Sequence, residues 1–290
     1  MFGELIKLTL EELNKYKSGD YKYIFEPNID RPNIQAQVVV GARRGYVSQR
    51  DLYCARQNLI AMMGQFFATR YFWQHPNYIY NDRIQVVSSE DTAKKIEKVS
   101  GPIIIVGGPE PNELTDLLIQ KYNLPVGFVS RKNINITLLN RKVKIKKGEL
   151  LSSEKFELIA KYKKYKYIDV PYGVAELDER WEPKKILGSF KTNEKIRGVL
   201  KEVTTVLVIY DDRLIIAGSM AAGTSSVVLS PSFLSKIDPE GLKNLIKEDL
   251  SRAVIVLKIV FKDRIQTPQD IIIQRPQDIK NIKIIKILYL

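Results

Sequence analysis

The sequence predicts an α/β fold in which a mainly parallel sheet is interrupted by a basic, β-rich insert. Between residues 34 and 122, three apolar runs each lead into a segment with helical spacing. After Pro125 that spacing disappears and lysines accumulate. Alternating strands and helices favour parallel strands joined by right-handed crossovers. We therefore expect residues 34–130 to form an α/β part, 131–200 the insert, and 201–290 a return to the sheet with a β-rich C-terminus.

Residues 1–33 are expected to form a short helix followed by a linker. Thr9 and Glu12 have the spacing of a capping box at the start of LEELNKY. Pro27 and Pro32 then interrupt regular structure, because proline lacks the backbone N–H that helices and central strands require.

The α/β part contains three predicted strand and helix pairs. A strand ends at Val40, and the helix after it starts near Ser48 and Asp51. The second strand, RIQVVSS, precedes a helix that we expect Ser88 to cap, and the third, IIIV, precedes NELTDLLIQKY. The first helix has apolar residues at three- and four-residue spacing, namely Leu52, Ala55, Leu59, Met62, Met63 and Phe66. One face of this helix is therefore expected to be buried.

The last third of the chain returns to the same pattern. Two apolar runs, TTVLVIY and LIIAG, are expected to be strands joined by a turn at Asp211 and Asp212. Asp238 is expected to cap a helix whose first residue is Pro239. TPQD and RPQD recur eight residues apart near the end and predict two similar turns.

Composition excludes several classes of site. One cysteine and one histidine in 290 residues rule out an intrachain disulfide and a Cys/His-rich metal centre. Cys54 is expected to be a buried apolar residue, and His75 to lie at a helix end. The acidic group Glu176, Asp178, Glu179 and Glu182 has no companion histidine. We predict no catalytic residue, no metal ligand and no cofactor.

The chain is expected to be a soluble, cytoplasmic protein. Its first residues do not have the pattern of a signal peptide, and no run of 18 to 20 apolar residues predicts a membrane span. Richness in Lys, Ile and Tyr is typical of a thermophilic archaeon or one of its viruses.

Three glycine-bearing loops, GARRG, GGPEPN and GSMAAGT, each follow a predicted strand and precede a predicted helix. In an open α/β sheet such loops meet at the carboxyl edge, where ligands usually bind. Backbone N–H groups at helix starts and arginine side chains both attract phosphates. The candidate ligand-binding residues are Gly41, Arg43, Arg44, Gly45, Gly107, Gly108, Asn112, Gly218, Ser219, Gly223 and Thr224.

The alternative is that these loops are only tight turns. None of them matches G-x-x-x-x-G-K-[ST] or G-x-G-x-x-G. In this alternative Asn112 caps a helix, and Arg43 and Arg44 are solvated.

The turns in VGGPEPNELT and IIAGSMAAGT also support a resemblance. A GGP-x-x-N turn followed about a hundred residues later by an AG-x4-GT turn resembles a Rossmann-like domain of mostly uncharacterised archaeal and bacterial proteins. The C-terminal region of archaeal S-layer-like proteins is similar. The resemblance covers residues 36–262 and implies a fold rather than an activity. It selects Gly107, Gly108, Pro109, Asn112, Gly218, Gly223 and Thr224.

The insert is the second candidate surface, because residues 131–167 contain 12 basic and 3 acidic side chains of a chain whose net charge is +13. Lys142, Lys144 and Lys146 are expected on one face of a strand. Lysines and tyrosines then alternate in KYKKYKY, where the candidates are Lys161, Lys163, Lys164, Lys166, Tyr162 and Tyr165. Cations that neutralise phosphates and aromatic rings that stack on bases form a nucleic-acid surface. The alternative is a lysine-rich edge strand that prevents aggregation.

Two function hypotheses follow. The preferred one is non-catalytic binding of a phosphate-bearing ligand, either a nucleotide at the glycine loops or nucleic acid along the insert. The other is a structural or assembly protein of a virion or cell envelope, with no small-molecule ligand and with a second chain or further copies of itself as partners.

Overall fold

The structure is a computed structural model that describes residues 37–66, 84–166, 172–192, 199–229, 231–262 and 278–290, together with residues 3, 6 and 170. Side chains of α2 are described as far as Leu59. The predicted helix cap at Thr9, His75, the side chains of Met62, Met63 and Phe66, and the TPQD turn lie outside this part of the chain.

The main sheet is mixed. Its order is β13-β12-β10-β11-β3-β1-β2, and β9 pairs with β10 as an eighth strand. The strands are β1 (Gln37–Gly41), β2 (Ile84–Val87), β3 (Ile103–Val106), β9 (Phe190–Thr192), β10 (Leu200–Tyr210), β11 (Arg213–Gly218), β12 (Arg252–Phe261) and β13 (Ile279–Tyr289). Only the neighbours within β2-β1-β3-β11 are parallel. The remaining pairs are antiparallel, so the expectation of a mainly parallel sheet holds for that core alone.

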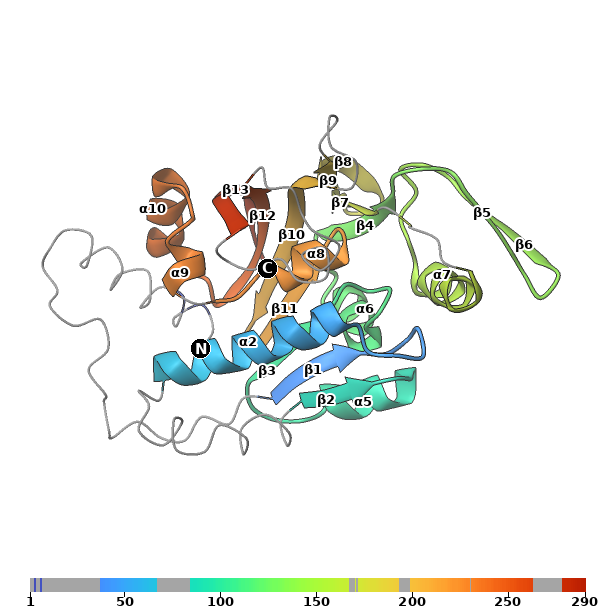
Figure 1. Cartoon of the computed structure of the whole chain (residues 1–290), viewed down its shortest axis with the longest axis horizontal. Coiled ribbons are helices and arrows are strands. Elements are labelled where there is room, and N and C mark those ends of the chain that lie inside the picture. The colour runs from blue at the N-terminus through green and yellow to red at the C-terminus, as the bar shows by residue number, and fades with distance from the viewer. Residues whose placement is uncertain are drawn as a thin grey trace, which may run out of the picture.

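Helices cover both faces of the parallel core, which explains why strands such as β3 are apolar at every position. The described helices outside the insert are α2 (Gln49–Phe66), α5 (Glu90–Glu97), α6 (Glu113–Lys121), α8 (Ala221–Ser225), α9 (Pro231–Leu234) and α10 (Pro239–Lys247), of which α10 lies beside β13. Ala55 and Leu59 of α2 pack with Val38 and Ile104 on one face, as the spacing predicts. On the other face α5 and α6 pack against the alternate residues of β1 and β3. In Figure 1, α2 crosses in front of β1 and β3.

Local signals predicted most helix starts correctly. Asn112 and Asp238 cap α6 and α10, and each side-chain oxygen accepts a hydrogen bond from a backbone N–H of the first turn. The cap expected at Ser88 is wrong by one residue. Ser89 has the extended backbone of a cap, and its hydroxyl accepts from the Thr92 N–H at 3.3 Å.

The hairpin turn at Asp211 and Asp212 is confirmed. It joins β10 to β11, and Asp211 has a φ of 51° there. Because β11 reverses direction in this turn, it pairs in parallel with β3. The loop after β11 therefore emerges at the same edge of the sheet as the loops after β1 and β3.

The insert consists of two small sheets and a helix. They are β4 (Val126–Ser130), β7 (Tyr172–Leu177) and β8 (Pro183–Gly188) in one sheet, β5 (Ile134–Leu138) and β6 (Arg141–Ile145) in the other, and α7 (Ser153–Tyr165). The expectation that helical spacing disappears after Pro125 is wrong for Ser153–Tyr165, which form α7. Phe156, Ile159 and Ala160 are buried at helical spacing, and that apolar stripe begins before the lysines. The β5–β6 hairpin projects away from the rest of the molecule (Figure 1).

Candidate functional site

The three glycine loops meet at the carboxyl edge of the parallel core, as expected. We call residues 41–45, 107–112 and 218–224 the loop cluster. The Arg43 N–H donates to the Pro111 carbonyl at 3.0 Å, and the Gly107 N–H donates to the Ile216 carbonyl at 3.0 Å. A methyl group added at Gly41 would lie 2.1 Å from the Pro111 carbonyl oxygen. The loops at residues 41–45 and 107–112 are therefore packed directly against each other.

The GGPEPN loop uses its polar groups internally. The buried Asn112 amide accepts a hydrogen bond from the Leu114 N–H at 3.0 Å and donates one to the Val106 carbonyl at 2.9 Å. The Thr115 hydroxyl donates to the Gly107 carbonyl at 2.8 Å. This arrangement matches the alternative in which Asn112 caps a helix and the glycines form a turn.

The GSMAAGT loop is also closed on itself. The Gly218 N–H donates to the Thr224 hydroxyl at 2.9 Å, and a methyl group at Gly218 would lie 2.4 Å from the Thr224 nitrogen. The hydroxyl of buried Ser219 has no hydrogen-bond partner among the described residues. Gly223 lies beside Thr205, whose hydroxyl would be 2.9 Å from an added methyl group. Gly218 and Gly223 thus allow close backbone packing.

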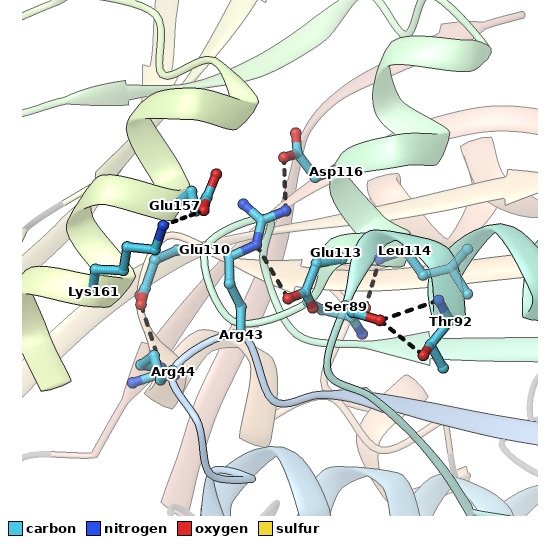
Figure 2. A network of polar contacts seen from close by, with 11 residues as sticks. Arg43, Arg44, Ser89, Thr92, Glu110, Glu113, Leu114, Asp116, Glu157 and Lys161 are labelled. Atoms are coloured by element: carbon cyan, nitrogen blue, oxygen red, sulfur yellow. Dashed lines mark hydrogen bonds and ion pairs between the residues drawn. The ribbon is translucent and has the colours of Figure 1, made fainter.

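Both arginines of GARRG are engaged by acids (Figure 2). Arg43 pairs with Asp116 at 3.0 Å and with Glu113 at 3.6 Å, and its side chain is 8% exposed. Arg44 pairs with Glu110 at 3.3 Å. The acids belong to the GGPEPN loop and to α6, so these ion pairs join the first two loops. The predicted role of Arg43 and Arg44 in binding an anion stays a prediction.

The C-terminal end of α7 reaches the loop cluster. Lys163 donates to Glu110 at 3.2 Å, so this buried carboxylate lies between Lys163 and Arg44. Lys164 extends beside Gly45, with its Nζ 3.8 Å from the position of an added methyl group. The sequence suggested two separate surfaces, but the structure makes them neighbours.

Asp51, in the first turn of α2, is a buried acid, although its position in the sequence indicates only a role at the helix start. Burial raises its pKa to about 6, although Arg44 acts in the opposite direction. Its Oδ2 has no hydrogen-bond partner in the described structure and faces Gly107. Burial also raises the pKa of Glu113. Burial lowers the pKa of Arg44, but attraction to Glu110 and Asp51 outweighs this effect, and the net shift is upward.

The loop cluster is therefore not a basic pocket. Three cations, Arg43, Arg44 and Lys163, are surrounded by four acids, which are Asp51, Glu110, Glu113 and Asp116. No signal local to GARRG predicts these pairs, because Arg43 and Asp116 are 73 residues apart in the chain.

The insert presents a different electrostatic surface. We call residues 132–147 the basic hairpin. One face carries Ile134, Ile136 and Ile145, which are buried with Phe156 and Ile159 of α7. The other face is exposed and carries Lys142 opposite Thr137 and Lys144 opposite Asn135. The expected alternation of lysines and apolar residues is confirmed for Lys142 and Lys144, whereas Lys146 lies just after β6, which ends at Ile145.

The lysines of the basic hairpin form no ion pair with any residue that the structure describes. Within the described residues, no ion pair involves Lys142, Lys144, Lys146 or Lys147, and all four are exposed. Arg141, at the start of β6, does pair with Glu154 of α7 at 2.5 Å. The exposed face of the hairpin therefore carries lysines and neutral polar side chains and no acid.

The candidates on α7 divide into two groups. Lys161 pairs with Glu157 at 2.5 Å (Figure 2), and Lys163 with Glu110. Lys164 and Lys166 have no acidic partner in the described structure, and Lys166 lies 5.7 Å from the ring centre of half-buried Tyr162. Tyr165 is 71% exposed. Of the two candidate tyrosines, Tyr165 is the more accessible to a stacked base.

Comparison of the chain with protein-family models, with curated proteins and with solved structures found no match.

None of the described helices is long and apolar enough to span a membrane. The described residues contain no group of three His, Cys, Asp or Glu side chains placed to hold a metal ion. The sulfur of Cys54 is buried and donates to the Val227 carbonyl at 3.3 Å, and burial raises the pKa of this thiol.

Proposed function

We propose that the protein binds nucleic acid through phosphate contacts along the basic hairpin and the adjoining end of α7. The observation that carries this proposal is the difference between two sets of cations. Arg43, Arg44 and Lys163 at the loop cluster are neutralised by buried acids. Lys142, Lys144, Lys146 and Lys147 are exposed, and their side chains form no ion pair within the described part of the chain. Unpaired lysines on a projecting ribbon can displace the counterions that surround a nucleic acid.

Other features of the insert support the same proposal. Lys164, Lys166 and exposed Tyr165 extend the basic surface onto α7, and an exposed aromatic ring offers a face on which a base can stack. Within this proposal the parallel core, with its central β2-β1-β3 order, is a Rossmann-like scaffold that supports the insert. Its role is to fix the hairpin in space rather than to hold the ligand.

A direct test is fluorescence anisotropy with 20-nucleotide single strands and 20-base-pair duplexes at low and at moderate salt. Lys142→Ala combined with Lys144→Ala is expected to weaken binding at least about tenfold at 0.1 M salt, because two phosphate contacts are lost. Lys243→Ala combined with Lys247→Ala on α10 removes the same charge from two exposed lysines outside the insert. This control is expected to bind within about twofold of the wild type.

Two results contradict the proposal. One is an absence of binding by the wild type at low salt, and the other is equal weakening by both double variants. The first result favours the structural or assembly role, in which the basic hairpin contacts another protein chain.

A nucleotide at the loop cluster is the less favoured ligand. The loops at residues 41–45 and 107–112 are packed against each other, and Arg43 and Arg44 are paired with acids. A thermal-shift screen of nucleotides separates the two ligands. A nucleotide at 100 times its Kd stabilises the folded protein by about 2.7 kcal/mol. We expect no shift, and a shift that disappears in Arg44→Ala supports the nucleotide instead.

A further inference from the structure

The turn of the basic hairpin contains a residue that folding does not explain. Leu139 and Asn140 connect β5 to β6, and their φ values are 49° and 65°. Two-residue hairpin turns with positive φ at both positions favour Asn and Gly. Asn140 fits this preference, but a leucine in the left-handed region is strained, because its side chain crowds the backbone.

Leu139 is also almost completely outside the protein. Its exposed fraction is 91%, the highest among the exposed large apolar residues of the described chain. It lies at the tip of the hairpin that projects from the body of the molecule (Figure 1). Leu139 therefore combines a strained backbone conformation with an apolar side chain that is exposed to water. Residues that break local rules without a benefit to folding are found most often at functional sites.

The surroundings of Leu139 indicate the kind of partner. Residues 132–147 include no acid, and Lys142 and Lys144 follow the tip on the exposed face. An apolar tip on a basic ribbon is complementary to a polyanion with an apolar interior. Stacked base pairs between two phosphate backbones have this combination of properties.

The hairpin is long enough for its tip to reach the floor of a duplex groove. Each strand has five residues, so the ribbon is about 16 Å long at about 3.3 Å per residue. The minor groove of B-form DNA is about 7.5 Å deep. Proteins that bind this groove frequently insert an apolar side chain between base steps, and the duplex bends as the bases unstack.

We propose that Leu139 is a wedge that the basic hairpin inserts between base pairs of double-stranded DNA from the minor groove, so that the duplex bends. Lys142 and Lys144 then contact phosphates beside the insertion point. This inference rests on the proposed function. It specifies that the nucleic acid is double-stranded DNA, that the contact is in the minor groove, and that the duplex bends.

The test measures bending separately from binding. A 30-base-pair duplex carries a fluorescence donor and acceptor at its two ends, and a second duplex carries 2-aminopurine to report unstacking. Saturation with the wild type is expected to raise both energy transfer and 2-aminopurine emission. Leu139→Asn keeps every charge and suits the left-handed backbone. It is expected to bind about tenfold more weakly and, at saturation, to change neither signal.

Ile186→Asn is the matched control. Ile186 is 57% exposed on β8 and lies outside the hairpin, so this variant removes an exposed apolar side chain without touching the wedge. It is expected to bend DNA like the wild type. Leu139→Asn is also expected to melt at or above the wild-type temperature, whereas loss of a packing residue would lower that temperature.

The outcomes distinguish the wedge from the proposed function. If the wild type binds no duplex at low salt, the proposed function fails and the wedge fails with it. If the wild type binds without bending, or if Leu139→Asn bends DNA fully at saturation, only the wedge is overturned.

Discussion

At the scale of single residues, Asp51 shows how burial controls ionisation. Its carboxyl group is completely buried, and its Oδ2 has no hydrogen-bond partner in the described structure. A buried carboxylate without full hydrogen bonding favours its neutral form, and the pKa of Asp51 is raised to about 6. The folded protein therefore holds this proton more tightly than the unfolded chain does.

This shift predicts a pH dependence of stability. Since the folded pKa lies above the ordinary value of 3.8, stability contributed by Asp51 is present at low pH and is lost as the pH rises through about 6. The loss is at most about 3 kcal/mol. Asp51→Asn lacks this titration. Its stability relative to the wild type is expected to increase between pH 4 and pH 7, as measured by urea unfolding at several pH values.

Asp211→Asn is the control for that experiment. The pKa of Asp211 is lowered, mainly by its hydrogen bond with Arg252, so its contribution is present above the ordinary pKa and is lost on acidification. This exposed pair is expected to give a small effect of the opposite sign. A constant difference between Asp51→Asn and the wild type across this range would contradict the argument.

Asn58 is a second buried polar residue with a definable role. Its amide nitrogen donates to the Val227 carbonyl at 2.7 Å, and its oxygen accepts from the Leu229 N–H at 2.9 Å. One side chain of α2 therefore satisfies the backbone of the segment after α8, which runs past it without regular structure.

Asn58→Ala is expected to lower the free energy of unfolding by about 2 to 4 kcal/mol, because it leaves buried backbone groups without this partner and also creates a cavity. Chemical denaturation measures this change. Arg56→Ala, at an exposed position of the same helix, is expected to change stability by less than about 0.5 kcal/mol. Similar effects of the two substitutions would show that the contacts of Asn58 do not matter.

At the scale of elements, the loops after β1 and β3 are interlocked rather than open. Gly41 is in contact with the backbone of Pro111 and Asn112, whereas Gly108 has only the Gly218 carbonyl within reach of an added methyl group, at 3.6 Å. The two glycines look equivalent in the sequence. Their surroundings differ, because a methyl group added at Gly41 would meet backbone atoms, whereas one added at Gly108 would have free space around it.

Gly41→Ala is expected to destabilise the protein by about 1 to 3 kcal/mol or more, because backbone atoms at 2.1 Å cannot move aside easily. Gly108→Ala is expected to be neutral or slightly stabilising, since its φ is not in the left-handed region. Thermal unfolding of both variants checks this difference. A large loss of stability in Gly108→Ala would mean that the space beside it is needed.

At the scale of the whole molecule, the charge is concentrated on the insert. Residues 131–167 carry 12 basic and 3 acidic side chains, whereas residues 1–130 carry 15 and 14. The loop cluster neutralises its own cations, whereas Lys142, Lys144, Lys146 and Lys147 on the projecting hairpin are exposed and form no described ion pair. A surface of this kind attracts polyanions and is sensitive to salt.

The salt dependence of duplex binding gives a quantitative prediction. If Lys142, Lys144, Lys146 and Lys147 each neutralise one phosphate, the logarithm of the binding constant falls with the logarithm of salt concentration with a slope of about −3.6. Lys142→Ala combined with Lys144→Ala is expected to make this slope about 1.8 units less steep. A titration at four salt concentrations measures both slopes. An unchanged slope in the double variant would mean that these two lysines do not touch phosphates.

Much of the local structure could be predicted because its causes are local. The strands at 37–41, 84–87 and 103–106, the turn at Asp211, and the caps at Asn112 and Asp238 depend on neighbouring residues. The alternating lysines and tyrosines of residues 161–167 do not indicate a helix, whereas the apolar stripe that begins at Phe156 does. The apolar stripe, rather than the lysines, makes this segment helical, because the stripe packs against β5 and β6.

By itself, the sequence determined most of the strands and helices and where positive charge accumulates, since periodicity, capping and composition are properties of short stretches of chain. Only the tertiary structure decided that the sheet is mixed, that acids far along the chain neutralise Arg43 and Arg44, and that the hairpin lysines stay unpaired. Strand pairing and ion pairing join residues that are distant in sequence. A buried apolar strand can pair in either direction, and an arginine can meet an acid from any segment that folding brings beside it.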